Sequence, residues 1–143
     1  VVLDVLLPPS SYRAGEVASN DDSLAVRLRY GEQAMLLSGD TEARGEEWLL
    51  NHHVALASQL LKVGHHGSHT SSTPGFVAAV QPQVAVISVG RDNLYGHPAP
   101  VVVERLAQEG ARVFRTDRDG AVQCRMDGTW LRIFLFHPPL GLR

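Results

Sequence analysis

Two short predicted strands near the middle of the chain, the runs at residues 58–63 and 84–89, constrain the fold more than any other feature of the sequence. The second run, VAVISV, is continuously apolar, which is typical of a β-strand that is covered on both faces. Between the two runs, residues 73–81 have a helical pattern, with Thr73 as a candidate N-cap and Pro74 at the first helical position. The sequence therefore predicts a β-α-β unit at its centre.

Hairpin patterns flank this central unit on both sides. Toward the N-terminus, the alternating run at residues 23–30 is joined by a Gly-Glu turn to a second run at residues 33–38. Toward the C-terminus, residues 121–136 form two apolar runs around Asp127-Gly128. Further strands are predicted at residues 2–7 and 112–116, and further helices at residues 41–53, with acids in the first turn, and 99–110. Hairpins at both ends with β-α-β segments between them predict an α/β fold, in which helices flank a mixed sheet.

The composition limits the classes of protein to which the chain can belong. A hydrophobic content of 44% with 20% charged residues is typical of a soluble globular core, and no apolar run is long enough to cross a bilayer. The formal net charge of −2 does not favour a strong nucleic-acid-binding protein. The first residue is Val1 rather than methionine, and it begins an apolar stretch, so we expect the chain to be part of a longer protein.

Three polar loops follow the carboxyl ends of predicted strands, at residues 36–42, 61–69 and 87–98. Because ligands gather at these strand ends in α/β sheets, we expect the three loops to lie close together. The candidate side chains are Asp40 and Glu42, then His65, His66 and His69, and finally Asp92, Tyr95 and His97. A carboxylate with several imidazoles suits zinc or manganese, so the sequence predicts a metal site at this edge of the sheet.

Some of these residues also have purely structural explanations. An aspartate after a strand, such as Asp40, commonly serves a turn or caps the next helix. His97 before Pro98 can simply order its loop. The adjacent pair His65-His66 is harder to explain in this way, because burying two imidazoles without hydrogen-bond partners costs free energy. The pair therefore favours a functional site.

The motifs in these loops resemble a known family in both order and spacing. The segments NDDSLAVRLRYGEQAMLLSGDTE, LLKVGHHGSHTSS and PQVAVISVGRDNLYGHPAPVVVERLAQEGARVFRTDRDGAV resemble the C-terminal half of a metallo-β-lactamase-fold hydrolase. Within that superfamily, the combination of GHHGS, SVGRDNLYGHP and RTDRDG is similar to the C-terminal domain of the ComEC family, the membrane channel proteins of bacterial DNA uptake in natural competence. The resemblance extends from about Leu3 to Val122.

This resemblance implies a β-α-α-β sandwich that holds two divalent metal ions, zinc or manganese, between its two sheets. The family's main ligand motif, H-x-H-x-D-H, does not occur in the sequence. Because that motif belongs to the N-terminal half of the fold, residues 1–143 are expected to be the C-terminal half of the hydrolase domain. We therefore expect the intact domain to be an enzyme, and the fragment alone to be inactive and to bind metal weakly or not at all.

The resemblance also implies a role for each site residue. Asp40 is similar to the carboxylate that bridges the two metals, and one histidine of the pair binds the second metal. The spacing from the aspartate in related phosphoesterases favours His66 as this ligand, while the opposite assignment, with His65 as the ligand, stays open. The other histidine would contact the phosphate or donate a proton. Glu42 matches a carboxylate that supports the site, and His97 matches a residue that lines the same cleft.

The function implied by the resemblance is metal-dependent phosphodiester hydrolysis, by a DNase-like domain that degrades the DNA strand that is not imported. Its partners would be single-stranded DNA and the membrane channel of the same protein, with this domain soluble and on the extracytoplasmic side of the cell membrane. Two alternatives stay open: a non-catalytic fragment that packs against the channel or contacts DNA, and a hydrolase of small phosphoesters. Half of a two-sheet sandwich leaves one sheet face uncovered, so we also expect the fragment to self-associate.

Overall fold

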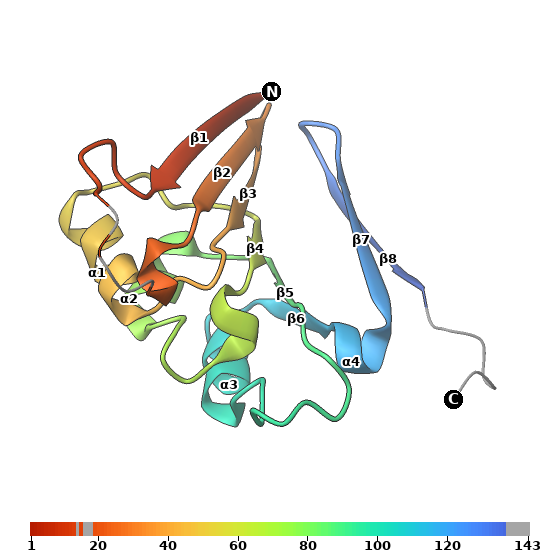
Figure 1. Ribbon diagram of the computed structural model, residues 1–143. Helices are drawn as coiled ribbons and strands as arrows, with labels where there is room; N and C mark the ends of the chain where they lie inside the picture. Colours follow the sequence, from red (N-terminus) through yellow and green to blue (C-terminus); the bar gives the residue numbers. More distant parts are fainter. Residues whose placement is uncertain (14, 16–18, 137–143) are drawn as a thin grey trace.

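The computed structural model describes residues 1–13, 15 and 19–136, and its main feature is a six-stranded mixed sheet (Figure 1). The strand order across the sheet, β1-β2-β3-β4-β5-β6, is the order of the strands in the chain. The first three strands are antiparallel to one another, and the strands from β3 to β6 are parallel. Strands β7 and β8 form a separate antiparallel hairpin. The predicted α/β fold, a mixed sheet flanked by helices, is confirmed.

The strands are β1 (Val2–Leu7), β2 (Ala25–Tyr30), β3 (Gln33–Leu37), β4 (Leu60–Lys62), β5 (Val84–Ile87), β6 (Arg112–Arg115), β7 (Ala121–Met126) and β8 (Leu131–Phe136). The helices are α1 (Ala43–Asn51), α2 (Pro74–Val80), α3 (Pro100–Gln108) and α4 (Thr116–Asp119), with short 3-10 helices η1 (Asn20–Asp22) and η2 (Gly64–Gly67). Successive parallel strands from β3 to β6 are connected through α1, α2 and α3, because parallel strands need a long crossover connection.

The hydrophobic core lies between the three longer helices and one face of the six-stranded sheet. Leu49 of α1, Phe76 of α2 and Val102 of α3 are fully buried, and they belong to one cluster with Leu61 and Ile87 of the sheet. Full burial of side chains of this size stabilises a fold by about 1.5–3 kcal/mol each. This core fixes the carboxyl ends of β3, β4 and β5 relative to one another, and the candidate site lies at these ends.

Several predicted strands are shorter in the structure than the sequence pattern indicates, and the run at residues 58–63 forms β4 only over Leu60–Lys62. Contacts between loops explain the ends of two other strands. Strand β5 ends at Ile87, because the carbonyl of Ser88 accepts a hydrogen bond from His66 instead of continuing the sheet. Strand β6 stops before Thr116, whose hydroxyl donates to the carbonyl of Val89. Both ends are set by contacts between loops that are distant in the sequence. Hydrophobic periodicity is a local property, so it cannot predict such contacts.

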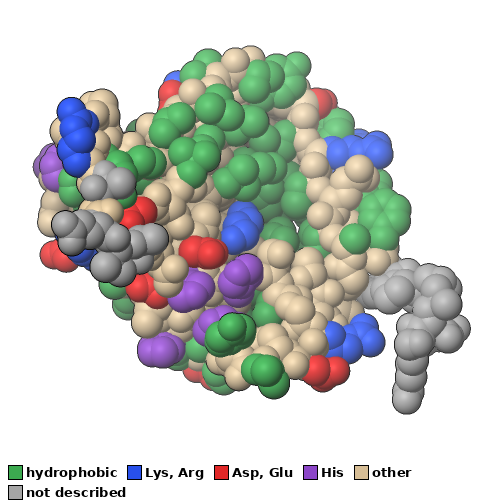
Figure 2. Space-filling view, in the orientation of Figure 1, with side chains coloured by type: hydrophobic (Ala, Val, Ile, Leu, Met, Phe, Trp, Pro, Cys, Tyr) green, Lys and Arg blue, Asp and Glu red, His purple; other side chains and the backbone are tan. Residues whose placement is uncertain are grey.

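The sheet face opposite the helices is apolar and exposed over its first three strands. The strand register places Leu3, Val5, Tyr30 and Leu37 on this face, with exposed fractions of 60%, 58%, 43% and 38%. Figure 2 shows hydrophobic side chains gathered in the upper part of the view, over β1 to β3. We refer to these four residues as the apolar face.

We expect the apolar face to drive self-association of the 143-residue chain, because large exposed apolar patches mark contact surfaces. Size-exclusion chromatography with light scattering should show dimers or larger species, and the double substitution Leu3→Ser and Val5→Ser should shift the distribution toward monomer. The matched control is Val101→Ser, at an exposed valine of α3 away from the apolar face. A wild-type monomer that binds no hydrophobic dye would contradict this expectation.

The β7–β8 hairpin extends from α4 and is tied to the main sheet at its tip (Figure 1). The backbone amide of Glu32, in the turn between β2 and β3, donates to the carbonyl of Gly128 at 2.7 Å. Residues 127–130 connect the two strands, and the Asp127 carboxylate accepts from two backbone amides of this connection. The hairpin predicted around Asp127-Gly128 is confirmed, but its connection is longer than the two-residue turn that this dipeptide favours.

Candidate metal centre

Three loops that follow β3, β4 and β5 meet at one edge of the sheet. Asp40 and Glu42 follow β3, the η2 turn with His65 and His66 follows β4, and the loop with His97 follows β5. The distance from His66 Nε2 to Asp40 Oδ1 is 3.8 Å, and the ring centroids of His65 and His97 are 5.6 Å apart. Figure 2 shows histidine side chains gathered beside acidic and basic side chains on this face. The predicted convergence of the three loops is confirmed.

The ring of His66 is fixed by a backbone carbonyl. Its Nδ1 lies 2.7 Å from the carbonyl oxygen of Ser88. Because a carbonyl only accepts hydrogen bonds, Nδ1 carries the proton, and Nε2 of the neutral ring keeps its lone pair. This lone-pair nitrogen is the atom that lies 3.8 Å from Asp40 Oδ1. Histidines that bind metals are usually oriented in this way, with the second ring nitrogen donating to a carbonyl or carboxylate.

His65 is held by a carboxylate instead. Its Nδ1 lies 2.9 Å from Glu42 Oε1, which also accepts from the Thr70 hydroxyl at 2.7 Å and from the Asn20 side-chain amide at 3.2 Å. These donors, the Thr70 hydroxyl above all, hold the pKa of Glu42 below its usual value. The ionised carboxylate accepts the proton of His65 Nδ1 and so directs Nε2 away from Glu42.

The backbone of the η2 turn has an uncommon conformation. The φ angles of His65 and His66 are 43° and 55°, in the left-handed region that non-glycine residues rarely adopt. The next residue, Gly67, is confined, because a Cβ there would lie 2.6 Å from the Pro98 side chain. Backbone strain costs about 1–3 kcal/mol per residue and persists where the surrounding structure holds it, typically at functional sites. The turn thereby presents imidazoles from two adjacent residues to one cleft.

His97 also lies in this cleft, whereas two other candidates do not belong to it. Burial lowers the pKa of His97, and the neighbouring histidine charges lower it further. The Tyr95 ring stacks on His97, with 5.9 Å between centroids and 18° between planes. Neither His69 nor Asp92 has a hydrogen bond, an ion pair or a ring contact with Asp40, Glu42, His66 or His97 among the described residues, although the charge of His69 adds to the lowering of the pKa of His97. We therefore do not include them among the residues of the site.

Lys62 belongs to the site, although the motif analysis misses it. It is the last residue of β4, and its ammonium group donates to the Gly39 carbonyl at 3.2 Å. Burial lowers the pKa of Lys62, and the nearby Asp40 carboxylate partly counters this effect. One signal could have found it: the only lysine in the sequence lies in the strand just before the histidine pair.

Asp40 and His66 fit two of the ligands that a metal ion needs. Ligand atoms about 2.0–2.2 Å from one ion can be up to roughly 4 Å apart, which agrees with the 3.8 Å between Asp40 Oδ1 and His66 Nε2. Within the described residues, no group of three or more His, Cys, Asp or Glu side chains is arranged to hold a metal ion. Two donors of suitable chemistry are in place, where a complete site has about four.

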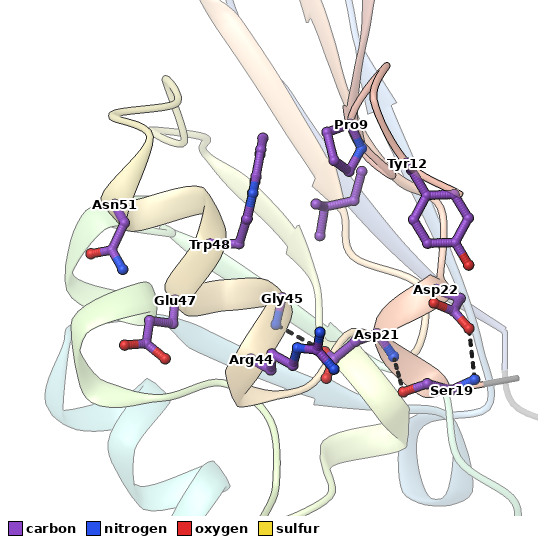
Figure 3. A pocket seen from close by; sticks show the side chains of 11 residues that line it. Pro9, Tyr12, Ser19, Asp21, Asp22, Arg44, Gly45, Glu47, Trp48 and Asn51 are labelled. Atoms are coloured by element: carbon purple, nitrogen blue, oxygen red, sulfur yellow. Dashed lines mark hydrogen bonds between the residues drawn. The ribbon is translucent and has the colours of Figure 1, made fainter. Parts of the chain in front are cut away.

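A pocket of about 330 Å³ lies beside α1 and η1, away from the candidate metal centre (Figure 3). Trp48 and Tyr12 line it together with Asp21, whose carboxylate accepts from the backbone amide of Glu42 at 2.9 Å. None of its lining residues in the described part of the chain is Asp40, Glu42 or a histidine of the cleft. Asp21 nevertheless supports the candidate metal centre, because it fixes the backbone of the residue that holds His65.

Comparisons with known proteins agree on one group of relatives, although no family model matches the chain. ComE operon protein 3 of Bacillus subtilis is 36% identical over 122 residues, which cover 85% of this chain and 16% of that protein. Competence protein ComA of Neisseria gonorrhoeae is 42% identical over 108 residues, or 75% of this chain and 16% of that protein. Recombination protein 2 of Haemophilus influenzae is 36% identical over 106 residues, or 74% of this chain and 13% of that protein.

The mixed α/β sheet and these similarities together define the family of the chain. The chain belongs to the ComEC family, as do the three relatives. It spans only 13–16% of the length of these relatives. In the part of the chain that the structure describes, no helix combines the length and the apolar character required to span a membrane.

Proposed function

We propose that this chain is part of a metal-dependent phosphodiesterase of natural competence, which hydrolyses the DNA strand that is not imported. The observation that carries the proposal is the pairing of Asp40 with His66, whose Nε2 lone pair is directed to the carboxylate by the Ser88 carbonyl. The names of the relatives support the setting, since two of them refer to the ComE operon or to competence. The metal would be zinc or manganese, both of which accept carboxylate and imidazole ligands.

In this proposal each residue of the cleft has one task. Asp40 and His66 hold the metal, which, when bound, polarises the phosphate and lowers the pKa of a water molecule. The 2.9 Å hydrogen bond that His65 Nδ1 donates to Glu42 fixes the ring of His65, so that its Nε2 can contact the phosphate or, in the doubly protonated ring, give a proton to the leaving group. Burial lowers the pKa of His97 and so favours its neutral ring, which can serve as a hydrogen-bond partner in the cleft.

Lys62 would supply a positive charge for the phosphate. We expect Lys62→Met to lower hydrolysis about 10²-fold, the loss typical of one removed donor to a developing negative charge, without loss of metal. Rate on a DNA strand and metal content by elemental analysis would be measured on the same preparation. Arg29→Met, which removes an exposed cation paired with Asp4, is the matched control. Joint loss of metal and rate would instead assign Lys62 to supporting Asp40 through the Gly39 carbonyl.

The proposed function is tested by hydrolysis of a single-stranded oligonucleotide by the complete protein that contains this chain. We expect cleavage that stops on chelation and returns when zinc or manganese is added. A small chromogenic phosphodiester, assayed in parallel, separates the alternatives. Cleavage of the small ester alone would favour a hydrolase of small phosphoesters. Absence of metal and of any cleavage, with DNA binding retained, would favour the non-catalytic fragment.

We also propose that this part of the protein lies on the extracytoplasmic side of the cell membrane, beside the channel, where the strand that is not imported would be available. Leu94 is 99% exposed, so Leu94→Cys should react with a thiol reagent that cannot cross the membrane of intact cells. The wild-type chain is the control, because burial raises the pKa of Cys124 and keeps its thiol slow to react. Labelling of Leu94→Cys only after lysis would place the domain in the cytoplasm.

A further inference from the structure

We propose that a small pocket beside His66 binds the base of the nucleotide next to the scissile phosphate, in a single strand of DNA. This inference rests on the proposed function and adds a base-binding site to it. The pocket has a volume of about 200 Å³ and lies between His66 and the loop that follows β5. Its lining residues are His66, Val89, Gly90, Asn93, Tyr95 and His97.

The lining of this pocket suits the face of a flat ring. Val89 is an apolar wall, and the stacked rings of Tyr95 and His97 form an aromatic one. Tyr95 is 83% exposed, so most of its ring is available to a ligand. Hydrolysis of a phosphate requires charged and polar groups, not an apolar and aromatic wall. Val89 and Tyr95 have no part in the proposed chemistry of the phosphate, so we assign a different task to this part of the lining.

The one side-chain amide of the pocket is already used within the loop. The Asn93 side chain donates to the carbonyls of Gly90 and His97, at 3.1 and 2.8 Å, and accepts from the backbone amide of His97 at 3.0 Å. Asn93 therefore holds the backbone of His97 in place and has little capacity left to read the edge of a base. Recognition by stacking alone tolerates all four bases.

The size and position of the pocket match a single base. Its volume of about 200 Å³ is below the roughly 300–1,000 Å³ of pockets that take drug-sized ligands. His66 lines the pocket and also lies 3.8 Å from Asp40, so a ring bound here adjoins the proposed metal centre. Proteins that bind single strands without sequence preference stack bases on aromatic side chains. A duplex keeps its bases paired and stacked internally, so the pocket favours single strands.

The net charge of the chain makes base stacking more important than electrostatic attraction for its affinity to a DNA strand. With a formal charge of −2, the chain offers little long-range attraction to a phosphate backbone. Contacts with individual bases can replace part of this attraction, and one base stacked on an aromatic ring changes affinity by roughly ten-fold. Tyr95 is therefore expected to contribute to affinity for the strand without touching the metal.

The test uses the complete protein and thymidine oligonucleotides in which one abasic residue is moved along the strand. Binding is measured by fluorescence anisotropy with the metal chelated, so that the strand stays intact. We expect the wild-type protein to bind roughly ten-fold more weakly when the base is missing at one particular position. Tyr95→Ala should weaken binding of the intact strand by a similar factor, and the two losses should not add. Tyr95→Phe should retain affinity, because the ring remains.

The matched control is Leu94→Ala, since Leu94 is fully exposed beside Tyr95 but does not line the pocket. Unchanged binding of the intact strand by Tyr95→Ala would overturn the proposal, as would equal binding of all abasic strands by the wild type. Cleavage assays with added metal keep this proposal distinct from the proposed function. Base-dependent binding without cleavage of any strand would retain the pocket and refute the nuclease. Cleavage of the strands with no dependence of binding on any base would support the nuclease and refute the base-binding pocket.

Discussion

Asp40→Ala should abolish DNA hydrolysis by the complete protein and release its metal, because it removes the carboxylate that faces the Nε2 atom of His66 at 3.8 Å. Loss of an outer support of a metal ligand typically costs 10–100-fold in affinity or activity, so loss of the ligand itself should exceed about 10²-fold. The measurements are metal content by elemental analysis and nuclease rate on the same samples. Asp92→Ala, at an exposed aspartate of the loop after β5, is the matched control.

The histidine pair provides the internal comparison for this experiment. His66→Ala should behave nearly as Asp40→Ala, because the Ser88 carbonyl orients the ring of His66 as a ligand. His65→Ala should slow turnover and keep the metal, since Glu42 holds that ring beside the site. If His65→Ala loses metal and His66→Ala keeps it, the assignment of the pair is reversed. If none of the three variants changes metal content or rate, the assignment of a metal centre to these residues is wrong. The alternative of a non-catalytic fragment is then favoured.

Glu46→Ala should lower the free energy of unfolding of the chain by about 3 kcal/mol, because it leaves two backbone N–H groups without their acceptor. The Glu46 side chain is 1% exposed and accepts from the amides of Ser72 and Thr73, at 2.5 and 2.7 Å. Arg105 completes the arrangement by donating to the Ser72 carbonyl. Burial raises the pKa of Glu46, and these amides counter that effect only in part.

Urea unfolding followed by tryptophan fluorescence measures this change in the 143-residue chain. The matched control is Glu47→Ala, at the exposed neighbour on α1, where a change within about 0.5 kcal/mol is expected. Glu46→Gln should fall between the two, because a single amide oxygen can replace only one of the two acceptors. Equal stability of Glu46→Ala and Glu47→Ala would show that water replaces the carboxylate at no cost.

The order of strands and helices follows from the sequence, because each apolar period is a local property. The runs at residues 58–63 and 84–89 form β4 and β5, and the three helical patterns form α1, α2 and α3. The convergence of Asp40 with the histidine pair was also predictable, because the carboxyl ends of parallel strands lie at one edge of a sheet. The apolar face is predictable from the period of two only for Tyr30 of β2, because the strand register brings Leu3, Val5 and Leu37 of the neighbouring strands onto the same side.

Other features depend on which segments meet in three dimensions. The acids in the first turn of α1 suggest an interaction with the helix dipole, yet Glu46 is buried and binds the loop before α2. A sequence pattern also cannot give the proton positions of His66, which depend on the Ser88 carbonyl at the end of another strand.

The sequence by itself determined the elements, their order and the edge of the sheet where polar side chains gather, because these depend on local periodicity and on the geometry of parallel strands. Only the tertiary structure decided that Lys62 lies beside Asp40, and that Glu42 rather than Asp40 holds His65. These pairings depend on the left-handed backbone of the η2 turn and on packing between loops. Contacts of this kind join residues that are far apart in the chain, so no local pattern encodes them.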